Sequence, residues 1–177
     1  YGNVFYKCSS GNFGGVQIHG GKDNLIDNNL FVDCKWAVSF SGWGQQRWLE
    51  FLDRADTKKA IDAVKALQPP YLTRYPELAR LREGEGISSI WRAVAVDCGG
   101  LLTRDRGIQD VADNLVTGRD PGFGDRDRLN FALRADSPVY DESGFRPIPF
   151  AEIGLYRDEH RASWPVENPV TTKYRIK

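Results

Sequence analysis

Short runs of alternating hydrophobic and polar residues recur along the first hundred residues and predict short β-strands. Residues 3–8 (NVFYKC) recur 26 positions later as residues 29–34 (NLFVDC), with a weaker copy at residues 93–98 (AVAVDC). A second run at residues 15–20 (GVQIHG) recurs 22 positions later as residues 37–42 (AVSFSG). Two short strands in each unit of 22 to 26 residues predict a solenoid of repeated coils.

Residues 45–83 interrupt this repeat with a helical pattern. Apolar side chains such as Trp48 and Leu52 recur there at helical spacing among charged residues, and a double proline ends the pattern. Cys34 and Cys98 are 64 positions apart, and subtracting the 39 interrupting residues leaves 25, which is one repeat. We therefore interpret this segment as a helical insertion between two coils.

The repeat length predicts an all-β fold in which coils stack as a parallel β-helix. A leucine-rich repeat shares the period, but its regular leucines are missing. Cys8, Cys34 and Cys98 then occupy one position on three successive coils, and we expect them to form a ladder of buried thiols.

The alternation also assigns side chains to the two faces of the strands. In the run at residues 15–20 it directs Gln17 and His19 outward, and in its repeat it directs Ser39 and Ser41 outward. In residues 29–34 both Phe31 and Cys34 are expected to be buried, which a strict period of two does not allow. A bend near Asp33 would resolve this conflict.

The Asn-rich segment NLIDNNLFVDC and the motif VQIHGG resemble right-handed parallel β-helix proteins of the pectate-lyase-like group. Residues 120–123 and 145–150 resemble the end of bacterial proteins of that type. The resemblance implies a secreted protein, extracellular or periplasmic, of which this chain is the C-terminal part, with upstream coils preceding it. The expected organisation is coils at residues 1–44, the insertion at 45–83, the last coils at 84–118 and an irregular capping tail at 119–177.

The resemblance further implies a carbohydrate-active protein whose partner is a polysaccharide or oligosaccharide. Glycoside hydrolysis is the first expectation. The alternatives are a noncatalytic carbohydrate-binding, adhesion or scaffold β-helix and a polysaccharide lyase. No cofactor is implied.

Carbohydrate-active β-helices bind their ligand along an exposed groove, which defines the candidate site. His19 is a candidate general acid or base, because the reference pKa of histidine, about 6.5, lies near neutral pH. Asp33 and Asp97 hold equivalent places on neighbouring coils, so their carboxylates could lie about 5 Å apart, as in a retaining glycosidase. The candidate substrate-binding residues are Gln17, Ser39, Ser41, Trp43, Arg74 and Tyr75.

Composition and motifs remove several other classes of function. The 24 basic and 24 acidic residues balance, so nucleic-acid binding lacks electrostatic support. No apolar run reaches the roughly 18 residues of a membrane span. Asp120, Asp125 and Asp127 do not follow an EF-hand pattern, and the cysteines lack zinc-site spacing, so no metal site is expected.

Overall fold

The computed structural model describes residues 1–21, 23–41, 44–83, 86–106 and 109–150. The chain divides into one unit from Tyr1 to Pro147 and a second from Ile148 to Lys177. In the second unit, the backbone N–H of Phe150 donates to the carbonyl of Ile148 (2.8 Å). Every helix and strand bounded below lies in the first unit.

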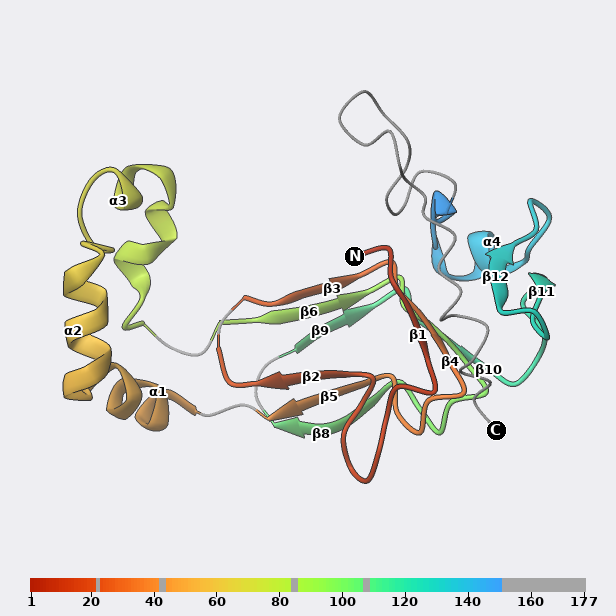
Figure 1. Cartoon of the computed structure of the whole chain (residues 1–177), viewed down its shortest axis with the longest axis horizontal. Coiled ribbons are helices and arrows are strands. Elements are labelled where there is room, and N and C mark those ends of the chain that lie inside the picture. Colours follow the sequence, from red (N-terminus) through yellow and green to blue (C-terminus); the bar gives the residue numbers. More distant parts are fainter. Residues whose placement is uncertain (22, 42–43, 84–85, 107–108, 151–177) are drawn as a thin grey trace, which may run out of the picture. The chain divides into compact units, whose positions relative to one another are not determined.

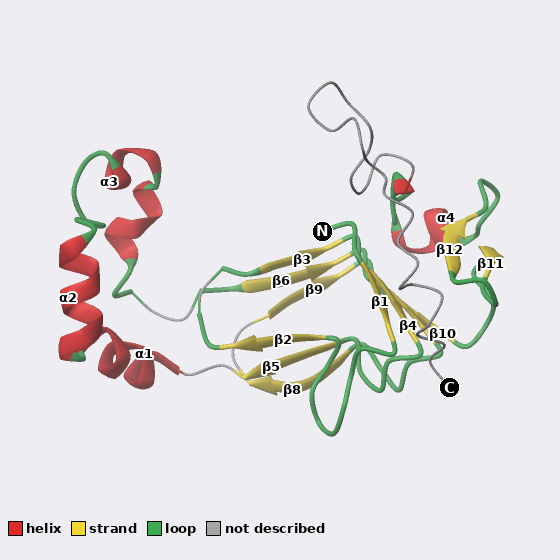
Figure 2. Ribbon diagram, viewed as in Figure 1, coloured by secondary structure: helices red, strands yellow, loops and turns green. Residues whose placement is uncertain are grey.

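Ten strands form three parallel sheets, A, B and C, whose neighbouring arrows lie side by side in Figures 1 and 2. Sheet A contains β1 (Val4–Tyr6), β4 (Leu30–Val32), β7 (Val94–Val96) and β10 (Leu115–Thr117). Sheet B contains β2 (Val16–His19), β5 (Val38–Ser41) and β8 (Leu102–Arg106). Sheet C contains β3 (Leu25–Asp27), β6 (Ser88–Trp91) and β9 (Gln109–Ala112). Along the chain, successive strands enter sheets A, B and C in turn.

The strand registers agree with the spacings read from the sequence. Val4 pairs with Leu30, which pairs with Val94, and Val16 pairs with Val38. The prediction of a mostly β protein with stacked parallel strands is therefore confirmed. Sheet C was not anticipated, because its three short strands share no repeated motif.

The core lies between the inner faces of the three sheets. The rings of Phe5 and Phe31 stack with centroids 4.8 Å apart, and Ile26 lies beside Ile90 in the register of sheet C. Phe31 and Ile90 are almost completely buried, whereas the equivalent position of β10, Val116, is 48% exposed. The core is thus densest in the middle strands of each sheet.

Left-handed backbone turns the chain sharply after the strands of sheet A. Lys7, Asp33 and Asp97 follow β1, β4 and β7 with φ of 54°, 53° and 52°. The bend predicted near Asp33 is confirmed, because a left-handed residue re-aims the side chains that follow it. Cys34 is buried as expected, but Cys8 is exposed, so the expectation of three buried thiols was wrong at Cys8.

Four helices lie between β5 and β6. They are α1 (Gly44–Asp53), α2 (Ala55–Ala63), α3 (Tyr71–Arg74) and the 3-10 helix η1 (Pro76–Arg80). The indole of Trp48 in α1 donates to the carbonyl of Leu81 after η1 (2.7 Å), and Arg82 forms an ion pair with Asp53 (2.9 Å). Trp48 and its neighbours therefore hold the helices to one another.

The described part of the tail contains a hairpin of β11 (Phe123–Asp125) and β12 (Asn130–Leu133), followed by α4 (Val139–Ser143). The ring of Phe131 lies 5.1 Å from that of Tyr6 in β1, and the backbone N–H of Arg146 donates to the side chain of Asn28 before β4. Both faces of β4 and β7 are buried. Residues 121–146 therefore cover the outer face of sheet A. The rest of the tail that we expect to act as a cap, residues 151–177, lies outside the described residues.

Candidate functional site

The outer face of sheet B carries the polar ladder predicted from the alternation. Gln17 pairs in register with Ser39, and His19 pairs with Ser41. The side-chain amide of Gln17 donates to the hydroxyl of Ser41 (3.4 Å) and to the carbonyl of Ile18 (2.9 Å). These bonds hold the Gln17 side chain along the sheet, so it forms part of a fixed polar surface.

Ser39 does not belong to the accessible part of this ladder. Its side chain is fully buried, and its hydroxyl donates to the Gln17 side-chain oxygen and accepts the backbone N–H of Gly14 (2.9 Å). Gly14 precedes β2 and lies directly against the backbone of β5. The expectation that Ser39 contacts a ligand was therefore wrong, because the segment before β2 covers it.

His19 ends β2 with an exposed side chain, as the alternation predicted. The chain turns immediately afterwards, where the backbone N–H of Gly20 donates to the carbonyl of Ser41 (3.0 Å). This bond fixes the corner beside His19. The imidazole is thus presented to solvent from a hydrogen-bonded strand end.

The structure adds one polar residue that the sequence reasoning missed. Thr103 in β8 pairs in register with Ser39 and extends the same face of sheet B. Residues 101–103 (LLT) follow residues 37–39 (AVS) by 64 positions, the spacing that also separates Cys34 from Cys98. Comparing the two segments with Ala, Val and Leu treated as one apolar class would therefore identify Thr103 as the counterpart of Ser39.

Asp33 and Asp97 lie together, but a cation bridges them. Arg126, in the turn of the tail hairpin, places one guanidinium nitrogen 2.9 Å from Asp33 and the other 2.6 Å from Asp97. The hydrogen bond to Asp97, and to a smaller extent the hydrogen bond to Asp33, raises the pKa of Arg126. In a retaining glycosidase, one carboxyl group must be free to protonate the leaving group, and the other must be free to attack the sugar. The geometry here is that of a structural clamp.

Arg74 and Tyr75 belong to the helical segment and not to sheet B. Arg74 ends α3, and its guanidinium carbon lies 5.7 Å from the ring centroid of Tyr75, which is 42% exposed. Trp43 lies outside the described residues. Arg74 and Tyr75 thus form a small cation–π pair on the helices, and no sheet B residue takes part in that pair.

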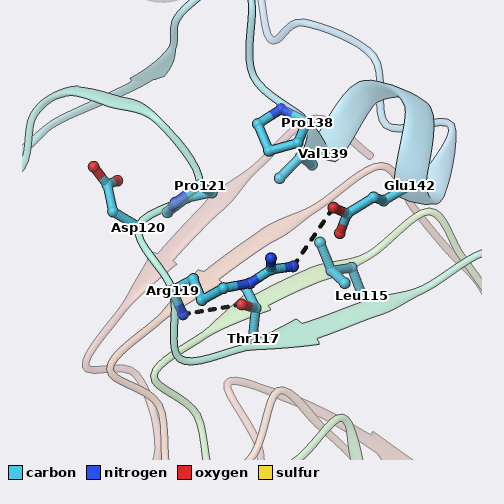
Figure 3. Close-up of a pocket in the computed structure, with 8 residues that line it drawn as sticks. All are labelled: Leu115, Thr117, Arg119, Asp120, Pro121, Pro138, Val139 and Glu142. Atoms are coloured by element: carbon cyan, nitrogen blue, oxygen red, sulfur yellow. Dashed lines mark hydrogen bonds and ion pairs between the residues drawn. The ribbon is translucent and has the colours of Figure 1, made fainter.

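The surface of the described residues is hollowed both within the helical segment and beside α4. One, of about 250 Å³, lies within the helical segment and is lined by Leu52, Lys58, Ile61, Asp62, Leu67, Leu81 and Arg82. The other, of about 70 Å³, lies between β10 and α4, where Arg119 reaches Glu142 (3.5 Å) and its backbone N–H donates to Thr117 (Figure 3). The second hollow is the smaller of these two.

Neither a metal centre nor a membrane-spanning helix is found in the described part of the chain. Across those residues, no group of three His, Cys, Asp or Glu side chains is arranged to hold a metal ion. None of the described helices is both long and apolar enough to cross a membrane.

Comparison with known proteins gives no relative for this chain. No protein-family model, curated protein or solved structure matches it. Its class is therefore defined by its own architecture, a β-rich protein of stacked parallel strands with a polar ladder on sheet B. The likeness to pectate-lyase-like proteins stays a prediction.

Proposed function

We propose that this chain is part of a secreted right-handed parallel β-helix protein that binds a polysaccharide along the outer face of sheet B. The β-helix interpretation is supported by the order of the strands, which enter sheets A, B and C in turn. In such an architecture each coil adds one strand to each sheet, so side chains at equivalent positions form ladders across the coils.

The observation that carries the proposal is the polar ladder itself. Gln17, Ser41 and Thr103 lie on neighbouring strands and offer uncharged donors and acceptors, with exposed His19 at the strand end. Neighbouring strands lie about 4.8 Å apart, close to the length of one sugar ring. A glycan chain running across the strands would meet one set of polar groups from each coil.

Glycoside hydrolysis is the second candidate, and the exposed imidazole of His19 favours it. Binding without turnover ranks first because Arg126 occupies the aspartate pair that we first considered for hydrolysis. Polysaccharide elimination is the third candidate, and Arg106 in β8 pairs in register with Ser41.

The test is a panel of neutral and acidic polysaccharides incubated with the full chain. Retention, new reducing ends and unsaturated products are scored separately. We expect retention on at least one glycan, lowered about tenfold or more in His19→Ala and Ser41→Ala, and unchanged in Ser89→Ala on sheet C. Equal retention by all three variants would remove sheet B from the proposal, whereas reducing ends that His19→Ala abolishes would establish hydrolysis.

A further inference from the structure

Three thiols follow the strands of sheet A at equivalent positions. Tyr6, Val32 and Val96 pair in register, and each is followed two residues later by a cysteine. Every thiol donates to the carbonyl of that strand residue, with distances of 3.1 Å for Cys8, 3.6 Å for Cys34 and 3.5 Å for Cys98. The shared bond gives the three side chains the same direction, so their sulfur atoms form a ladder.

Neighbours in this ladder are close enough to be joined covalently. Adjacent strands of a sheet lie about 4.8 Å apart, and disulfide-bonded cysteines have Cα atoms about 4.4 to 6.8 Å apart. Val32 and Val96 pair in register, so Cys34 and Cys98, each two residues further on, occupy adjacent positions of the ladder. Cys34 is buried and Cys98 is half-buried, whereas Cys8 lies exposed at the other side of Cys34.

We propose that Cys34 and Cys98 are a disulfide-forming pair that links the coil before the helical segment to the coil after it. The two S–H bonds break and one S–S bond forms between the Sγ atoms. A small-molecule disulfide accepts the two electrons and two protons and leaves as two thiols. Cys8 keeps its thiol in this reaction.

The local chemistry favours this pair. Interaction with Cys98 lowers the pKa of the Cys34 thiol, and interaction with Cys34 together with burial raises that of Cys98. A thiolate is the group that attacks a disulfide, so a lowered pKa within this pair favours the exchange. The new bond would close a loop of 98 − 34 = 64 residues that contains all of α1 to η1.

The test is oxidation of the full chain by oxidised glutathione, followed by thiol titration in denaturant and peptide mapping. We expect free thiols to fall from three to one, a peptide in which Cys34 is linked to Cys98, and an unfolding temperature raised by roughly 5 to 15 °C. The matched control Cys8→Ser should give the same linked peptide and the same rise, with no thiol left.

Two variants test the pairing from the other side. Cys98→Ser and Cys34→Ser should each abolish the linked peptide and the rise in unfolding temperature, and circular dichroism checks that each has folded. The proposal is overturned if a folded Cys8→Ser protein keeps both thiols after oxidation. It is also overturned if the wild-type linkage joins Cys8 to another cysteine or to a second chain.

Discussion

The guanidinium of Arg126 lies 2.6 Å from the carboxylate of Asp97, a contact that joins the tail hairpin to the corner after β7. The second terminal nitrogen of the same guanidinium donates to Asp33 after β4, which is 93 positions away in the sequence. The corners after β4 and β7 and the segment that covers sheet A are therefore held by one side chain.

Replacing Arg126 with alanine should loosen the hairpin. The three side chains are between 28% and 37% exposed, so we expect a loss of only about 1 kcal/mol in the free energy of unfolding. Urea denaturation measures this loss. Arg128→Ala is the matched control, because that side chain is 88% exposed and its ion pair is with Asp125 of the same hairpin (3.6 Å). Equal losses in both variants would mean that the clamp contributes nothing.

The side chain of Asn29 should contribute more to the stability of the stacked strands than Arg126 does. Its side chain is almost fully buried, and its oxygen accepts the backbone N–H of Asn3 (3.0 Å) while its amide donates to the carbonyl of Asp27 (3.0 Å). Asn29→Ala leaves both groups without that partner, so we expect a loss of about 1 to 3 kcal/mol in unfolding free energy. Asn130→Ala, in the exposed hairpin, is the control and should change little. A neutral Asn29→Ala would contradict the structure at this corner.

A substitution at Gly14 tests how closely the segment before β2 packs against β5, where it buries Ser39. A Cβ atom at Gly14 would lie 2.5 Å from the backbone carbon of Val38 and 2.6 Å from the backbone nitrogen of Ser39. Backbone cannot yield easily, so Gly14→Ala should lower the unfolding free energy by about 1 to 3 kcal/mol. In the matched control Gly118→Ala the nearest atom is 3.7 Å away, and the loss should be much smaller. The same loss in both variants would argue against the close approach.

The stability of the protein should depend on pH through the carboxyl group of Asp120. The backbone N–H groups of Gly122 and Phe123 donate to its carboxylate (2.9 and 3.2 Å) and lower its pKa below the usual value. A lowered folded-state pKa stabilises the protein above the unfolded value of about 3.9, and that contribution disappears as the pH falls through the folded value. Urea midpoints measured from neutral pH down to about pH 2.5 should therefore fall more steeply in the wild type than in Asp120→Asn. Parallel curves would exclude this contribution.

The sequence predicted the parts of the fold that repeat. Residues 3–8 and 29–34 share both spacing and apolar pattern, which is enough to set the register of β1 on β4. The outward position of Gln17 and His19 followed from simple alternation. These features are local in each coil, so a pattern along the chain reveals them.

Contacts between distant segments escaped this reasoning. Arg126 is an ordinary loop residue in the sequence, and only the path of the tail brings it to Asp33. Ser39 alternates as an outward residue, yet Gly14 covers it. No periodic pattern encodes either contact, and both changed the candidate site by removing Asp33, Asp97 and Ser39 from ligand contact.

The central claim, that sheet B carries the glycan, is tested most directly by NMR. The isotopically labelled full chain is titrated with a glycan retained in the polysaccharide panel, and amide shifts are followed residue by residue. We predict that the largest saturable shifts fall on Gln17, His19, Ser41 and Thr103, while Ser89 and Asp110 on sheet C stay unchanged. Shifts concentrated on sheet C or on the helices, with sheet B unaffected, would contradict the account.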